Sequence, residues 1–393
     1  MSAKSHALLA LTAAATALPG VTAHAQQIAE DVEIGYRYHK YDEDPIDASK
    51  LLSGSADRYD IDVHQFKLIA PLSESVQLDF DYQTEKMSGA SPWLTLLTGD
   101  QEVAQVMSGA SIEDKRTDVA TKLSYFFDRQ VIGVGVAHSD EDDYESLAFA
   151  VNYALETEDR LNTFSLAADV SNDDINAVDA DLFPQRPATE QSKQSNSVLF
   201  SYTRVLTKQI VAKFSLGYAE KTGYLSDPYK QTFVAFNLLG DSRPDSRYST
   251  TLSTQLRYFN DTLNGALHLD YRYYDDSWDI SSNTIKLSWY QNLPWGIQVV
   301  PSIRLYDQSE AFFYQVFYAE APANGLYSTD YRLSEYGAIT YGLTINKSFE
   351  NITFSLAAET YQSGGSKGLA DADSENPGLV DFDLVSVGVN YRF

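Results

Sequence analysis

The residues able to support catalysis are few in this chain of 393 residues. His138-Ser139-Asp140, and His64 with Asp60 and Asp62, place a base near a hydroxyl or a carboxylate, as nucleophilic hydrolysis requires. Neither set matches a phospholipase or protease motif. The chain has no cysteine, which excludes thiolate zinc sites, iron–sulfur clusters and disulfides. It also carries no phosphate loop or dinucleotide fingerprint. We therefore predict a protein that is not an enzyme and holds no cofactor.

An oxygen-rich run could bind calcium, and it consists of Asp173, Asp174, Asn176, Asp179 and Asp181. The calcium loop of an EF-hand needs a glycine and a terminal glutamate at fixed positions, and this run lacks both. A solvated acidic loop is the simpler interpretation, so no metal site is predicted.

Composition narrows the class of protein further. The chain has 55 acidic against 29 basic residues, a formal net charge of −26, whereas nucleic-acid binding needs clustered Lys and Arg. Its 27 Tyr and 19 Phe argue against disorder. After residue 25, no stretch reaches the roughly 18 consecutive apolar residues of a membrane-spanning helix. We expect an ordered acidic protein that does not bind nucleic acid.

The first 25 residues have the features of a secretory signal peptide. Lys4 supplies the positive n-region, Ala7 to Ala17 the apolar h-region, and Ala23-His24-Ala25 a cleavage site of small residues. We predict cleavage near Ala25, followed by one exported domain over residues 26–393.

Apolar and polar residues alternate with a period of two along most of the remaining chain, which is typical of β-strands with two different faces. The segment Val76–Tyr82 is an example. In the second of the predicted strands the alternation changes phase around His64-Gln65, and we attribute this change to a bulge. Sixteen strands are expected, at residues 32–43, 59–72, 76–87, 114–127, 130–142, 144–155, 162–173, 194–206, 209–223, 248–260, 265–278, 280–293, 297–310, 331–346, 351–363 and 383–393.

The connections between these strands are alternately short and long, which is typical of outer-membrane barrels with short periplasmic turns and long extracellular loops. In lipid every backbone N–H and C=O must be paired, so a β-protein spans a membrane only as a closed barrel. A β-sandwich would show the same alternation, but aromatic residues near the ends of the apolar faces favour interfacial girdles. We predict an all-β, antiparallel, up-and-down transmembrane barrel of about 16 strands, with 14 or 18 as alternatives.

The final strand is a second indication of an outer-membrane location. Its apolar face ends on Tyr391 and Phe393, and the other face consists of Ser386, Gly388, Asn390 and Arg392. A terminal aromatic of this kind resembles the signal by which the barrel-assembly machinery recognises its substrates. We therefore expect Phe393 to contact that machinery, and the outer-membrane lipid and lipopolysaccharide to surround the barrel.

If the apolar residues face lipid, their neighbours face the lumen. The candidate pore-lining residues are Arg37, Asp79, Asp81, Lys122, Asp169, Lys213, Arg257, Asp270, Arg272, Lys286, Arg304 and Glu359. Such charges either pair and stiffen the wall, or lie opposed across a wet pore. The remaining acidity falls mainly in the long loops, where it forms a solvated rim or attracts cations over about 8 Å at physiological salt.

Two long loops have unusual composition. In residues 88–113, two copies of Met-Ser-Gly-Ala-Ser (87–91 and 107–111) flank an apolar segment that would fill the lumen, constrict it or pack on a partner. Residues 221–247 are the only loop region with net positive charge. The candidate constriction or binding residues of the two loops are Trp93, Leu94, Leu96, Leu97, Lys221, Tyr224, Asp227, Tyr229 and Lys230.

Four segments carry a resemblance to a known family: Met107–Asp114, Lys221–Lys230, Asp270–Trp278 and the run from Pro301 to Tyr314. Over nearly the whole mature chain, the sequence resembles a bacterial outer-membrane β-barrel family of uncharacterised function, DUF3570. The resemblance implies a barrel but no activity. It also implies a setting near periplasmic flavin and redox proteins in the cell envelope.

Two functions from different classes follow from this sequence. The first is a passive pore for small polar solutes, with acidic loops that favour cations. The second is a closed scaffold or receptor whose loops bind protein partners in an envelope complex. An open lumen with charges on opposite walls would favour the pore, and a lumen filled by residues 88–113 would favour the scaffold.

Overall fold

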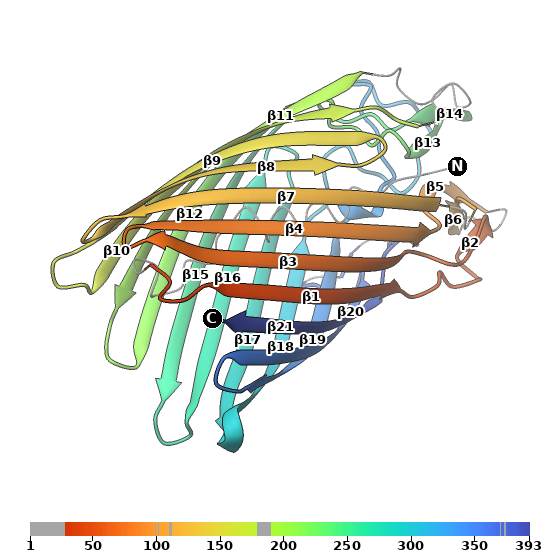
Figure 1. Cartoon of the computed structure of the whole chain (residues 1–393). Coiled ribbons are helices and arrows are strands. Elements are labelled where there is room, and N and C mark those ends of the chain that lie inside the picture. Colours follow the sequence, from red (N-terminus) through yellow and green to blue (C-terminus); the bar gives the residue numbers. More distant parts are fainter. Residues whose placement is uncertain are drawn as a thin grey trace.

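The protein is a closed barrel of 16 antiparallel strands in a computed structural model that describes residues 28–98, 100, 102–109, 112–178, 190–369, 371–372 and 375–393 (Figure 1). The predicted signal peptide lies outside these residues. The strands of the barrel are β1 (Glu33–Glu43), β3 (Asp60–Ser73), β4 (Val76–Gly89), β7 (Ile112–Phe126), β8 (Gln130–Asp140), β9 (Tyr144–Glu156), β10 (Asn162–Ile175), β11 (Gln191–Val205), β12 (Ile210–Gly223), β15 (Ser246–Asn260), β16 (Gly265–Asp276), β17 (Ser281–Leu293), β18 (Ile297–Gln308), β19 (Tyr336–Ser348), β20 (Ile352–Gly364) and β21 (Phe382–Arg392).

Each barrel strand pairs with the barrel strands before and after it in the chain, and β1 pairs with β21 to close the ring. The fold is therefore up-and-down, and the predicted strand number and topology are confirmed. One boundary was wrong: residues 331–335 were expected to begin a strand. They contain instead the short 3₁₀ turn η3 (Tyr331–Leu333), and β19 begins only at Tyr336.

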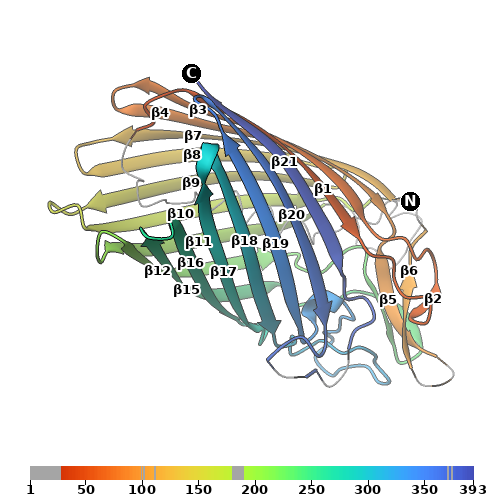
Figure 2. The same ribbon diagram turned by 90° about the horizontal axis from the view of Figure 1, so that it is seen from below.

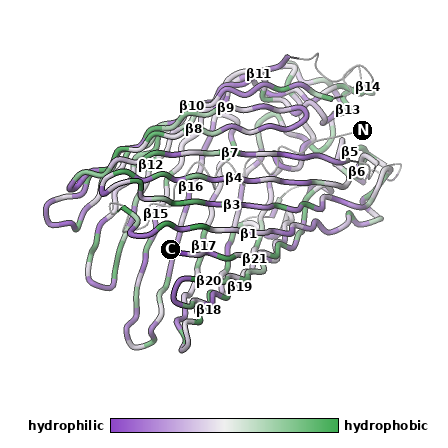
Figure 3. The backbone as a smooth tube through the Cα atoms, viewed as in Figure 1, coloured by the Kyte–Doolittle hydropathy of each residue, from purple (hydrophilic) through white to green (hydrophobic). Residues whose placement is uncertain are grey.

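The outer face of the wall is apolar and exposed. Tyr82, Val151 and Leu356 expose 39%, 55% and 51% of their side chains, and many equivalent positions around the ring behave in the same way. The tube coloured by hydropathy shows the alternation along the strands (Figure 3). A sandwich would bury this apolar face between its sheets, whereas a closed ring that exposes it requires lipid as its solvent. No helix among the described residues is long and apolar enough to cross a membrane.

The predicted bulge at His64-Gln65 is absent. The pairing of β3 with β1 and β4 runs without a register shift through these residues. The register of β3 with β4 shifts instead near the end of β3, between Pro71 and Ser73. The change of phase has a different cause: Ile61 and Val63 are buried on the inner face, while Phe66 is exposed on the outer face. Near one end of the barrel the inner face is therefore apolar because other residues cover it.

Two small sheets stand at that end, in the long loops. Strands β2 (Leu51–Ser53), β5 (Pro92–Leu97) and β6 (Val103–Met107) form one sheet in the order β2-β6-β5. Strands β13 (Gln231–Val234) and β14 (Asn237–Gly240) form a hairpin. The opposite end has only short connections, including the turn η2 (Pro294–Gly296). Both views show the long loops gathered at a single end of the barrel (Figures 1 and 2).

Candidate functional site

The long loops pack into one structure over the end of the barrel, which we call the loop cap and define as the described residues within 44–59, 90–111, 224–245, 309–335 and 365–381. Most large buried side chains of the described protein lie in this cap or on the wall directly beneath it. One cluster joins Tyr59, Ile61, Met87 and Tyr229, and another joins Trp278, Phe313 and Leu333. The molecule's hydrophobic core is therefore in its loops, because the barrel wall turns its apolar face outward.

Three loops of the cap begin on widely separated parts of the wall. Along the ring, six strands separate residues 90–111 from 224–245, four separate 224–245 from 309–335, and six separate 309–335 from 90–111. A ring of 16 strands has a diameter of about 30 Å, given their spacing and tilt. Loops that begin so far apart can touch only by crossing the mouth.

The three loops do touch, through polar contacts. The Lys230 ammonium donates to the carbonyl of Pro92 at 2.5 Å, which links 224–245 to 90–111. The Thr95 hydroxyl donates to the carbonyl of Val316, which links 90–111 to 309–335. The cap therefore narrows the mouth of the barrel.

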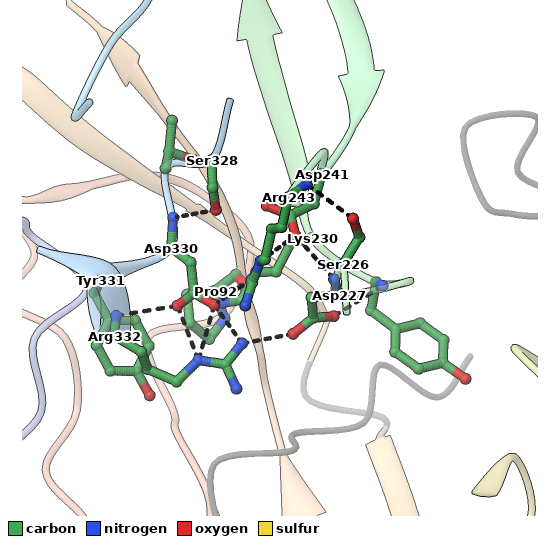
Figure 4. Close-up of polar contacts among 12 residues, drawn as sticks. Pro92, Ser226, Asp227, Lys230, Asp241, Arg243, Ser328, Asp330, Tyr331 and Arg332 are labelled. Atoms are coloured by element: carbon green, nitrogen blue, oxygen red, sulfur yellow. Dashed lines mark hydrogen bonds and ion pairs between the residues drawn. The ribbon is translucent and has the colours of Figure 1, made fainter. Parts of the chain in front are cut away.

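A cluster of ion pairs fixes the centre of the cap, and we call it the cap ion cluster (Figure 4). It consists of Asp227, Lys230, Asp241, Arg243, Asp330 and Arg332. Arg243 pairs with Asp241 at 2.6 Å and with Asp330 at 2.8 Å, so it joins two loops. Arg332 joins the same loops, with 2.6 Å to Asp227. Three carboxylates balance three cations, and the side chains of Asp241 and Asp330 have no exposure.

The electrostatics of the cluster follow from this burial. Burial opposes ionisation of Asp330, but the charges of Arg332, Lys230 and Arg243 outweigh it and hold the pKa of that carboxyl well below its usual range. Burial lowers the pKa of Lys230 to about 8, although Asp330 and Asp227 act in the opposite direction. Its ammonium also lies 5.3 Å from the centre of the Tyr331 ring.

The other two loops are attached to the same centre. The side chain of Asn376 is fully buried, and its amide donates to the hydroxyl of Tyr314 at 2.9 Å and to the carbonyl of Thr329 at 3.0 Å. Arg58 pairs with Glu43 at 2.9 Å, and its guanidinium carbon lies 5.7 Å from the centre of the Tyr331 ring. All five loops therefore form one folded unit.

The inner wall below the cap is polar and solvated. The side chains of Lys67 and Asp81 approach to 3.8 Å and remain 54% and 47% exposed. Arg257 pairs with Asp270 at 2.6 Å, and Asp79 lies opposite Lys122 in the strand register. Exposed ions on the face opposite the lipid-facing belt mean that water enters the barrel.

Charge is distributed unevenly around this inner wall. Because side chains alternate along a strand, the residues next to the exposed apolar positions face inward. Strands β11 to β18 of the ring contribute eight inward bases and two acids: Lys193, Lys213, Lys221, Arg247, Arg257, Arg272, Lys286 and Arg304, with Asp270 and Asp276. Strands β19 to β21 and β1 to β10 of the ring contribute five inward bases and eleven acids: Arg37, Lys67, Arg116, Lys122 and Arg392, with Glu33, Glu43, Asp79, Asp81, Glu85, Asp114, Asp118, Glu156, Asp169, Asp173 and Glu359. Six neighbouring strands of the ring are therefore basic on balance and the other ten are acidic, and we call these two unequal parts of the wall the basic half and the acidic half.

The family described as "Protein of unknown function (DUF3570)" matches residues 8–378. The chain belongs to this family. No curated protein matches it. Among solved structures, CdiB from Acinetobacter baumannii has a TM-score of 0.51 at 8% identity, covering 93% of this DUF3570 barrel and 60% of CdiB. The siderophore receptor PirA from Pseudomonas aeruginosa has a TM-score of 0.43 at 11% identity, covering 86% of this chain and 57% of PirA. This barrel thus spans less than two thirds of either protein, and the likeness to CdiB concerns the fold alone.

The candidate residues of the two unusual loops lie in or beside the cap of this DUF3570 barrel. Leu94 is buried in β5, where the other residues of the apolar segment, Trp93, Leu96 and Leu97, are partly exposed. Tyr224, Asp227, Tyr229 and Lys230 belong to the cap, whereas Lys221 is on β12 and exposed. The glycine of the first repeat, Gly89, has a φ of +135°, and a Cβ there would lie 2.1 Å from the carbonyl of Arg58. The repeat thus allows a close chain crossing where the cap begins.

The twelve candidate pore-lining residues all lie on barrel strands, on the face opposite the apolar belt. The structure pairs Arg257 with Asp270. It also places Lys286 directly opposite Arg304. These two like charges can be recognised as neighbours only when the strand register is known.

Among the described residues, the catalytic candidates His138 and Ser139 are not assembled as a site. His138 is exposed on the outer face and Ser139 is buried on the inner face, so the two point to opposite sides of the wall. Of the calcium candidates, Asp173 accepts from Ser146 and pairs with Lys193 at 3.3 Å, and Asp179 and Asp181 lie outside the described residues. Three carboxylates that the sequence did not indicate lie together beside the guanidinium of Arg116: those of Asp114, Glu141 and Asp143. One oxygen of each lies within 4.8 Å of the oxygens of the other two.

Proposed function

We propose that this DUF3570 barrel is a passive channel of the outer membrane for small polar solutes, with a mouth narrowed by the loop cap. The observation that carries the proposal is the solvated, charged inner wall, represented by the exposed pair Lys67 and Asp81. A closed ring of 16 strands is wide enough to hold an aqueous channel. The cap then limits the size of a solute, since it crosses the mouth from three sides.

The surroundings of the channel follow from its surface. Lipid and lipopolysaccharide contact the apolar belt, and the acidic loops favour cations at the mouth. Phe393 is 64% exposed beside Tyr391, with ring centres 4.7 Å apart, so the terminal aromatic is accessible to the barrel-assembly machinery.

A second function, a closed scaffold or receptor in an envelope complex, is favoured by the cap ion cluster. Arg243 and Arg332 each connect two loops through buried carboxylates, so the cap presents a rigid surface rather than flexible loops. Rigid loops bind a partner at a lower entropic cost.

Single-channel recording separates the two functions. The chain from residue 26 is refolded, checked for heat-modifiable migration on gels, and inserted in a planar bilayer under a salt gradient. Steady conductance with a cation-selective reversal potential supports the channel. The matched variant replaces residues 92–107 with a short Gly-Ser linker, which removes β5 and β6 from the mouth.

The linker variant decides the case of a silent barrel. A wild type without conductance and a variant with large conductance mean that the cap closes the barrel, which supports the scaffold. If both conduct equally, the cap does not limit the mouth. If neither conducts, the channel proposal is wrong.

A further inference from the structure

Three cations of the basic half stand together near the middle of the wall. Lys286 on β17 lies directly opposite Arg304 on β18 in the strand register, and Arg272 on β16 lies opposite Thr284, two residues from Lys286. Side chains at directly opposed positions have Cβ atoms about 5 Å apart, and like charges there destabilise a sheet. A costly arrangement at the inner surface of a solvated barrel calls for an explanation.

Within the described residues, these three cations have no ion pair, which distinguishes them from Lys193, Arg247 and Arg257 but not from Lys213 and Lys221. Lys193 pairs with Asp173, Arg247 with Asp276, and Arg257 with Asp270. Asp270 also lies opposite Lys286 in the register, but its carboxylate is bound by Arg257 at 2.6 Å. Within the described part of the chain, neither a hydrogen bond nor an ion pair engages the charged groups of Arg272, Lys286 and Arg304.

Neighbouring tyrosines hold the two guanidinium groups in place. The guanidinium of Arg304 lies 5.8 Å from the centre of the Tyr306 ring, and that of Arg272 lies 5.9 Å from the Tyr274 ring. The two phenols donate elsewhere, Tyr306 to Gln308 at 2.6 Å and Tyr274 to Asp276 at 2.6 Å. Ring contacts orient the cations without using their N–H donors.

The three side chains are also accessible. Arg272 is exposed and Lys286 and Arg304 are partly exposed, although all three face inward, so solvent in the lumen reaches them. Guanidinium groups present paired N–H donors that match carboxylate and phosphate oxygens, and an ammonium adds a point charge. We propose that Arg272, Lys286 and Arg304 form a binding subsite for the carboxylate or phosphate group of a small solute in transit. This subsite rests on the proposed channel function and names the chemical class of its solute.

The acidic half of the wall refines that class. Asp79, Asp81 and Glu85 face inward on β4, on the other half of the ring. A solute with an anionic group and an amino group would meet opposite charges on the two sides of the lumen. Acidic loops would attract its ammonium, and the basic subsite would hold its anionic end.

The test measures binding separately from conductance. Inorganic phosphate is added to the refolded protein in detergent micelles, and the width of its phosphorus NMR signal is followed against protein concentration. Lys286→Gln combined with Arg304→Gln should weaken binding about tenfold, since charge-assisted hydrogen bonds are lost. Arg272→Gln alone should weaken it less. The matched control is Lys67→Gln, an inward and exposed base on the acidic half, which should leave the binding unchanged.

A second arm identifies the source of the anionic group. Acetate and glycine are added as competitors at equal concentration, and displacement of phosphate by glycine at lower concentration than by acetate indicates a zwitterion. If acetate and glycine displace phosphate equally well, the anion subsite is supported and the acidic half does not contribute to the choice of solute. The proposal is overturned if the double variant binds phosphate as the wild type does, or if Lys67→Gln loses as much binding.

Failure of the subsite and failure of the channel give different results. Conductance without phosphate binding rejects the subsite and leaves the channel. Phosphate binding that the double variant loses, in a barrel that never conducts, rejects the channel and keeps an anion site. In a conducting barrel, the double variant should also shift the reversal potential towards stronger cation selectivity.

Discussion

Charged residues in the cap and on the basic half of the wall occupy opposite physical situations. In the cap ion cluster, three carboxylates neutralise three cations, and the Asp330 side chain has no exposure. On the wall, Lys286 faces Arg304 without a counterion and in contact with solvent. The first set connects loops and depends on complete pairing, because an unpaired buried charge is costly. The second set has free donors, which suits the binding of a solute.

The largest effect should come from breaking the cap ion cluster. Asp330→Asn leaves Arg332 and Arg243 buried with one carboxylate fewer, which costs about 3–5 kcal/mol. The cap should open while the barrel remains closed, because the wall does not depend on Asp330. Limited proteolysis should then cleave within the cap, and single-channel conductance should rise.

The control for this variant is Asp128→Asn, at a carboxylate that is 85% exposed in the short-turn end. It should change neither proteolysis nor conductance. A protease-resistant cap in Asp330→Asn would mean that packing, rather than the ion cluster, fixes the loops.

A smaller effect should follow from the buried pair of Arg58 and Glu43, whose side chains are 1% and 5% exposed. Glu43→Leu leaves the guanidinium buried without its counterion and should destabilise the cap by about 3 kcal/mol. Glu43→Leu combined with Arg58→Met should recover most of this loss, since apolar residues of similar volume replace a desolvated pair. The urea midpoint for protease cleavage of the cap measures both. A double variant weaker than Glu43→Leu would show that Arg58 stabilises the cap through Tyr331 instead.

Lys230 should give the cap a pH dependence of about 1–2 kcal/mol. Its pKa in the folded protein is lowered to about 8 from 10.5, so the unfolded chain binds more protons between these values. Stability therefore increases as the pH rises from 8, once Lys230 can lose its proton. Above pH 10 the buried phenol of Tyr331, whose pKa is raised mainly by burial, acts in the opposite direction.

The measurement is the rate of cap proteolysis from pH 7 to 10, normalised to a peptide substrate. It should slow between pH 8 and 10 in the wild type. Lys230→Met should remove this dependence, and Asp128→Asn should retain it. A wild-type rate that increases over the same range would mean that the neighbouring carboxylates Asp330 and Asp227 keep Lys230 protonated.

The sequence predicted the wall well and the cap poorly, for a physical reason. Wall strands have a local period of two set by lipid on one side and water on the other, so each can be recognised from a dozen residues. The cap depends on contacts between distant segments, such as Asn376 with Tyr314. Alternation does not specify such contacts. We therefore expected loops where β2, β5 and β6 form a sheet.

One signal of the cap was present in the sequence and misinterpreted. The change of phase in β3 was attributed to a bulge, but Ile61 and Val63 are apolar on the inner face because the cap covers them. The residues that produce the charge asymmetry of the wall were also identified in the sequence, because all twelve pore-lining candidates face inward. The asymmetry becomes visible only when the strands are arranged around the ring, with β18 beside β17 and opposite the acidic strands.

The smallest effect concerns the wall itself and has the opposite sign. Lys286→Gln removes one of two like charges at directly opposed positions, so it should stabilise the barrel by a few tenths of a kcal/mol in the absence of anions. Lys67→Gln removes a partly exposed ion pair with Asp81 and should destabilise it by no more than a similar amount. Urea unfolding of the two variants in micelles, with and without phosphate, tests the difference. Phosphate should stabilise the wild type and Lys67→Gln, and Lys286→Gln should gain less, because a ligand stabilises the folded state only where it binds. A loss of stability in Lys286→Gln without phosphate would mean that this lysine has a structural partner, and the contrast between the cap and the wall would then not hold at this position.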